Sequence, residues 1–71
     1  MYNLYFENSR GVRRLVRMMV AEDKLCSAAC EETAKINPDY KIYYVRSWEH
    51  SNGEIMIDVG SHSEFFIGVP V

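Results

Sequence analysis

Apolar and polar side chains alternate at the start of the chain. In residues 2–7, YNLYFE, the residues Tyr2, Leu4 and Phe6 fall on one side, and a more polar set falls on the other. A period of two with many aromatic residues predicts a β-strand with one buried face. The polar residues that follow, up to Gly11, predict a turn.

Residues 12–20, VRRLVRMMV, fit two different elements. Wound as a helix, they separate the arginines from an apolar side that includes Val12 and Leu15, and the period alone favours a helix. Drawn as a strand, they would return along the first strand directly after the turn at Gly11, and no helix end signal precedes Glu22. The pattern by itself leaves both elements open.

Residues 22–37 give the clearest helical pattern. Glu22 and Asp23 suit the positive N-terminal end of a helix. Asn37 ends it, because the residue before a proline disfavours the helical conformation. One face carries mainly small or apolar residues, which are Leu25, Cys26, Ala29, Thr33 and Ile36. We therefore expect this helix to lie close to a sheet.

Residues 40–50, YKIYYVRSWEH, alternate again and predict a long strand. Alternation places Tyr44, Arg46 and Trp48 on one face of that strand. Aromatic residues and arginine are enriched at protein interfaces, so this face is a candidate contact surface.

A hairpin is predicted at Asn52-Gly53. This dipeptide is the strongest short signal for a type I′ turn, in which both central residues have positive φ. Residues 54–59 would return antiparallel to the preceding strand. After GSHS the strand would resume at residues 64–67, with Gly60 permitting a bulge or a sharp bend.

Together these elements predict an α+β domain of ββαββ order, with two antiparallel hairpins in one sheet and the helix packed on one face. The alternative is βααββ, with a short helix in place of the second strand. The length of 71 residues predicts a single domain, residues 1–71. No apolar run approaches the roughly 20 residues that span a bilayer, so we expect no membrane partner.

The net charge of −2 is unevenly distributed. The first 20 residues have a balance of +3 and the remainder a balance of −5. One basic edge on an acidic body is not typical of a protein that coats nucleic acid. Cys26 and Cys30 on one helix face would form a strained bridge, so we expect reduced thiols and a cytosolic compartment.

Three segments, YKIYYVRSW, the NG turn and IDVGSHSEFFI, together resemble a group of small uncharacterised proteins encoded by phages and mobile elements of Gram-positive bacteria. The resemblance implies that residues 12–20 form a strand. It also implies a bacterial host cytosol, where very small phage proteins often bind and block a host protein, as anti-CRISPR proteins do. It implies no known activity, and no functional residue is carried over from it.

The segment Ser61-His62-Ser63-Glu64 contains the residue types of a hydrolytic site. A serine nucleophile needs a base within hydrogen-bond reach and an acid behind that base. Neighbours in an extended strand point to opposite faces, so His62 would face neither serine. We predict no catalytic residue and no enzyme activity. A structural role, as a turn or bulge, is predicted for Asp58, Gly60, Ser61, His62 and Glu64.

Cys26, Cys30, His50 and His62 are side chains that can bind zinc. The C-x3-C spacing on a helix differs from the C-x2-C of zinc knuckles, and the two histidines lie on separate strands. We therefore expect neither a metal nor another cofactor.

Two binding functions remain. In the alternative, arginines contact phosphates while aromatic residues stack on the bases of a single-stranded nucleic acid. The residues in question are Arg10, Arg13, Arg14, Arg17, Tyr43, Tyr44 and Trp48. Our main hypothesis is a non-enzymatic protein that binds a host protein, and a homodimer would use the same kind of surface. The residues predicted to contact the partner are Tyr44, Arg46, Trp48, Arg13 and Arg17.

Overall fold

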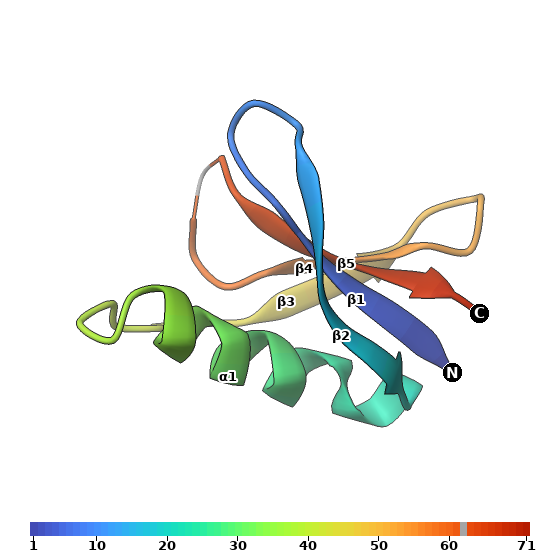
Figure 1. The fold of residues 1–71 in the computed structure, drawn as a ribbon, viewed down its shortest axis with the longest axis horizontal. Coiled ribbons are helices and arrows are strands. Elements are labelled where there is room, and N and C mark those ends of the chain that lie inside the picture. Colours follow the sequence, from blue (N-terminus) through green and yellow to red (C-terminus); the bar gives the residue numbers. More distant parts are fainter. Residues whose placement is uncertain (62) are drawn as a thin grey trace.

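The computed structural model describes residues 1–61 and 63–71, which form one curved antiparallel sheet with a helix packed against it (Figure 1). The elements are β1 (Tyr2–Glu7), β2 (Arg13–Val20), a short 3₁₀ turn η1 (Glu22–Lys24), α1 (Leu25–Ile36), β3 (Arg46–Glu49), β4 (Ile55–Asp58) and β5 (Phe65–Pro70). The strand order across the sheet is β2-β1-β5-β4-β3. The predicted α+β class and the ββαββ-like arrangement are confirmed.

One difference concerns the C-terminal part. Residues 54–67 were expected to form one bent strand, but the chain reverses after Asp58 and returns as β5. Ile57 faces Phe66 and Ile55 faces Gly68 in an antiparallel register, and β5 pairs with β1 on its other side. Because Gly60 has a φ of +97°, which side chains other than glycine rarely adopt, the chain turns fully at this point.

Strand β2 confirms the strand predicted for residues 12–20 and carries two irregularities. The first bulge lies between the pairs Tyr2–Val20 and Leu4–Arg17, where β2 has one residue more than β1. The second lies between the pairs Leu4–Arg17 and Tyr5–Leu15, where β2 again has one extra residue. At the first bulge Met19 has a φ of +55°, and its N–H donates to Asn3 Oδ1 at 3.1 Å. Each bulge shifts the following side chains to the other face of the strand.

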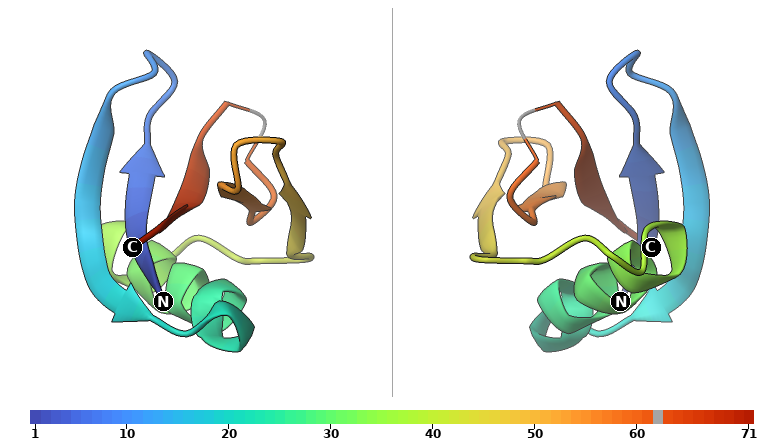
Figure 2. Two further views of the ribbon diagram at one scale, coloured as in Figure 1. Left: turned by 90° about the vertical axis from the view of Figure 1, so that its right-hand side faces the viewer. Right: turned by 90° about the vertical axis from the view of Figure 1, so that its left-hand side faces the viewer.

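The hydrophobic core lies between α1 and the facing side of the sheet. Leu4, Leu25, Ala29, Ile57 and Phe66 are all buried there. The helix lies close to the sheet, as expected, because β5 has a glycine at the contact. A Cβ atom on Gly68 would lie only 3.0 Å from Leu25 Cδ1. Figure 2 shows the sheet curving, with β2 and β3 at its outer edges and α1 across one side.

Three local details differ from the sequence prediction. The 22–37 helix begins as the 3₁₀ turn, and Ile36 is exposed rather than inside. Strand β3 is limited to Arg46–Glu49. It begins only at Arg46, because this residue pairs with Asp58, the last residue of β4, and the chain turns away beyond Asp58.

No helix in the described part of the chain is long and apolar enough to cross a membrane.

The predicted hairpin is present but has a different turn. The loop is Ser51–Gly53, with the Gly53 N–H donating to His50 O at 3.0 Å and the His50 N–H to Glu54 O at 2.8 Å. Gly53 has positive φ, whereas Asn52 does not, so this is not a type I′ turn. A three-residue loop with glycine last is the next most common hairpin connection.

Candidate functional site

Three of the predicted contact residues lie together on β3 and the residues before it. The Arg46 guanidinium carbon lies 5.9 Å from the Tyr44 ring centre and 5.7 Å from the Trp48 ring centre. Both distances are within the range of cation–π attraction. Tyr44 is 47% exposed and Trp48 is 40% exposed. We call Tyr44, Arg46 and Trp48 the Arg46 cluster.

A buried carboxylate holds this cluster in place. Asp58 is only 1% exposed, and its Oδ2 accepts a hydrogen bond from Arg46 Nε at 2.9 Å. Its Oδ1 accepts from the Gly60 N–H, also at 2.9 Å. The two residues meet because Arg46 and Asp58 are register partners of β3 and β4. One aspartate therefore both orders the exposed arginine and fixes the start of the reversing loop.

The cluster lies on an outer edge of the sheet. Strand β3 pairs only with β4 among the described strands, and all four of its residues are exposed. Trp48 packs edge-to-face on Phe65, with ring centres 6.2 Å apart, which anchors one side of the cluster. The surface therefore combines ordered aromatic and cationic side chains with the unpaired backbone of an edge strand.

Arg13 and Arg17 are not part of this surface. The bulges in β2 put Arg17 opposite Leu4, on the helix side, where it binds Glu31 at 2.8 Å and Glu32 at 2.7 Å. Arg13 binds Glu7 at 2.9 Å and Glu54 at 3.2 Å. Arg13 and Arg17, which were predicted as contact residues, therefore lie on different faces of β2. Both side chains join parts of the fold and are neutralised by carboxylates.

Two of these carboxylates have altered acidity. Burial alone would raise the pKa of Glu32, but hydrogen bonds from Arg17 and Lys35 outweigh it and lower that pKa overall. The hydrogen bonds from Arg13 lower the pKa of Glu54. In both cases the folded protein favours the charged form.

This predicts a loss of stability in acid. A lowered folded-state pKa contributes stability that is present above the ordinary value of 4.5 and is lost as the pH falls through the folded value. The free energy of unfolding, measured by urea titration, is therefore expected to decrease as the pH falls through and below 4.5. The Glu32→Gln variant should show a shallower decrease, because position 32 then takes up no proton.

Two arginine variants sharpen this test. Arg17→Leu removes a cause of the lowered Glu32 pKa and should also make the decrease shallower. Arg10→Leu changes the net charge equally at an exposed turn and should leave the decrease as in the wild type. Parallel curves for the wild type and Glu32→Gln would contradict the assignment.

The loop after β4 organises its own backbone through hydrogen bonds to Ser61. Ser61 Oγ accepts hydrogen bonds from the N–H groups of Ser63, at 3.4 Å, and Glu64, at 3.1 Å. A Cβ on Gly60 would lie 3.1 Å from the Tyr40 hydroxyl, so glycine allows this tyrosine to pack against the loop. His62, which was assigned to the same segment, lies outside the described residues.

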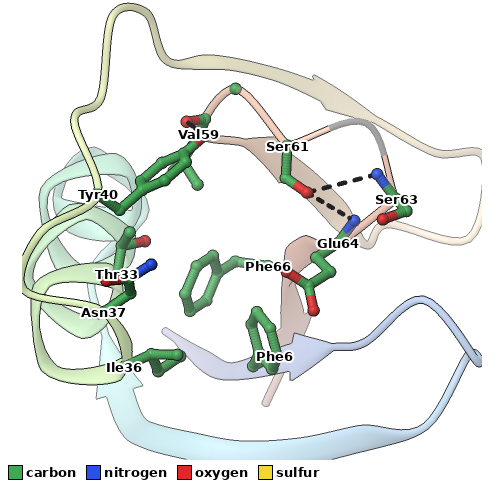
Figure 3. Close-up of a pocket in the computed structure, with 11 residues that line it drawn as sticks. Phe6, Thr33, Ile36, Asn37, Tyr40, Val59, Ser61, Ser63, Glu64 and Phe66 are labelled. Carbon is green, nitrogen blue, oxygen red and sulfur yellow. Dashed lines mark hydrogen bonds between the residues drawn. The ribbon is translucent and has the colours of Figure 1, made fainter.

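Sequence reasoning missed a cavity between this loop and the end of α1 (Figure 3). Its volume is about 370 Å³. The described residues that line it are Phe6, Thr33, Ile36, Asn37, Tyr40, Val59, Gly60, Ser61, Ser63, Glu64 and Phe66. They come from three separate segments of the chain, and no spacing within the sequence indicates that these segments meet.

The two cysteines and the possible metal ligands were the other candidates for a chemical role. Cys26 and Cys30 are free and half-buried, and burial is the main cause that raises the pKa of the Cys30 thiol. A raised pKa leaves less thiolate and hence a less reactive group. Among the described residues no group of three histidine, cysteine, aspartate or glutamate side chains could hold a metal ion.

Comparisons with known proteins give no match, whether to protein-family models, to curated proteins or to solved structures. Function is therefore argued from the geometry above.

Proposed function

We propose that this protein is a non-enzymatic binding protein and that its Arg46 cluster contacts a protein partner. One observation carries the proposal. The Arg46 guanidinium is exposed, yet it is fixed by the buried Asp58 carboxylate and flanked by two exposed aromatic rings.

Arginine, tyrosine and tryptophan are the residues that most often dominate the energy of protein interfaces. Binding usually costs side-chain entropy, and that cost is smaller for a side chain that is already ordered. Arg46 is ordered by Asp58 and Trp48 by Phe65. The unpaired edge of β3 adds a second mode of contact, because an extended segment of a partner can hydrogen-bond to it.

The resemblance of the C-terminal half to small phage proteins suggests where the partner is found. We take it to be a protein of a Gram-positive bacterial host, and inhibition of that protein to be the biological role. A single-stranded nucleic acid is the weaker alternative, because Arg13 and Arg17 are already neutralised by carboxylates.

The test is affinity capture from a nuclease-treated Gram-positive lysate, followed by mass spectrometry. We expect the wild-type protein to retain one host protein in stoichiometric amount. Tyr44→Ala and Arg46→Glu should each weaken its retention by roughly 30-fold or more, the loss typical of a dominant interface residue. Circular dichroism establishes that each variant is folded.

Arg10→Glu is the matched control, because it reverses an exposed arginine far from β3 and should retain the same protein. Equal retention by Arg46→Glu and the wild type would refute the role of the cluster. Retention that depends on leaving out the nuclease would replace the protein partner with a nucleic acid.

A further inference from the structure

The cavity below the reversing loop has an aromatic floor. Phe6 and Phe66 come from the paired strands β1 and β5, with ring centres 5.2 Å apart and ring planes inclined at 60°. Ile36 and Asn37, at the end of α1, form one wall, and Tyr40 forms another (Figure 3). A volume of about 370 Å³ lies within the range of small-molecule sites in proteins.

The charge of the lining selects the ligand. Among the described residues that line the cavity, Glu64 is the one charged side chain. Its carboxylate makes no hydrogen bond or ion pair to any other described residue, and in Figure 3 it points toward the two phenylalanine rings. An anion would be repelled here, whereas a cation would meet both the carboxylate and the negative faces of the rings.

The hydrogen bonds of the lining agree with this selection. The Thr33 hydroxyl donates to Ala29 O at 2.8 Å, and the Tyr40 hydroxyl donates to Val59 O at 3.2 Å. Their hydrogens are thereby used, and each oxygen is left as an acceptor. The Asn37 amide and the Ser61 hydroxyl still have hydrogens, because their oxygens accept from backbone N–H groups. The cavity therefore suits a ligand with N–H donors and at most a few acceptors.

We propose that this cavity binds an organic ammonium group carried on a compact apolar body, with Glu64 as its counter-ion and Phe6 and Phe66 as its aromatic floor. The ammonium can belong to a free amine or to a lysine side chain, since both present the same chemistry. The cavity lining shares no residue with the Arg46 cluster, and its test uses none of that cluster's residues.

The experiment is a titration of the intact protein, followed by amide chemical shifts in NMR. The probes are 2-phenylethylammonium, its neutral counterpart 2-phenylethanol and the anion phenylacetate. We expect the ammonium probe to shift the amides of residues 33–37, 39–40, 59–61 and 63–66. It should also bind about tenfold or more tightly than the alcohol, as expected for a hydrogen bond to a charged group. Phenylacetate should produce no shifts. A parallel titration with N-acetyl-lysine amide distinguishes a lysine side chain from a free amine.

Variants test the role of each part. Glu64→Gln keeps the shape and the backbone hydrogen bond to Ser61, and should abolish the preference for the ammonium probe. Ile36→Trp should block the cavity and prevent binding of any probe. Glu49→Gln removes a charge on the exposed strand β3 and should bind as the wild type does. The proposal is wrong if the wild type binds the alcohol as tightly as the amine, if Glu64→Gln keeps the preference, or if no probe shifts the cavity residues.

Discussion

Replacing Phe66 by alanine is expected to lower the free energy of unfolding by about 3–5 kcal/mol, which is a large part of the stability of this protein. Phe66 is 1% exposed and lies on the central strand β5, where it pairs with Phe6 and Ile57. Truncating a buried phenylalanine costs about 3–5 kcal/mol. A chain of this length has a total stability of roughly 4–10 kcal/mol, so one substitution removes a large part of it.

Urea unfolding monitored by circular dichroism measures this loss. Phe65→Ala is the matched control. Phe65 is the neighbour of Phe66 in the sequence, but it points to the other face of the sheet and is only half-buried beside Trp48. We expect its cost to be less than half that of Phe66→Ala. Equal costs would mean that the two faces of the sheet contribute equally to the core, contrary to the fold described above.

The second large effect is expected at Asp58. Replacing this residue by alanine removes the hydrogen bond from Arg46 and leaves the Gly60 N–H without its acceptor. Losing a hydrogen bond to a charged group, together with an unsatisfied backbone donor, costs about 2–4 kcal/mol. The same substitution frees Arg46, so partner binding through the Arg46 cluster should weaken even in the molecules that remain folded.

Asp58→Asn separates these two consequences. The amide oxygen can still accept from the Gly60 N–H, but the charge that holds Arg46 is gone. We expect its loss of stability, measured by urea unfolding, to be smaller than that of Asp58→Ala, with a comparable loss of partner affinity. If Asp58→Ala unfolded at the same urea concentration as the wild type, the aspartate would have no structural role.

The elements with local signals were predictable from the sequence. Alternation indicated β1, the periodicity and Asn37-Pro38 indicated α1, and Gly53 marked a hairpin. The register of β5 was not predictable, because its pairing with β1 joins residues some 60 positions apart and leaves no local pattern. The reversal after Asp58 was also missed, because Gly60 was interpreted as a bulge or bend within one strand and not as a turn between two strands.

In the candidate site, too, only the features that depend on local sequence were predictable. Tyr44, Arg46 and Trp48 could be placed together, because alternation along one strand is a local property. The separation of Arg13 from Arg17 could not be foreseen, because it depends on one extra residue in β2, between Leu15 and Arg17, that only the pairing reveals. The cavity depends on how the end of α1 meets the loop after β4, which is a property of the tertiary structure.

The place of β5 in the sheet has a consequence for biosynthesis. The last strand of the sequence lies between β1 and β4, and it alone joins the β1–β2 hairpin to the β3–β4 hairpin. Until residues 65–70 have been added, neither hairpin has the strand that pairs it with the other, and their apolar sides lack this neighbour. The complete sheet therefore forms only after translation of β5, and a chain that lacks this strand exposes apolar surface and unpaired strand edges that favour aggregation.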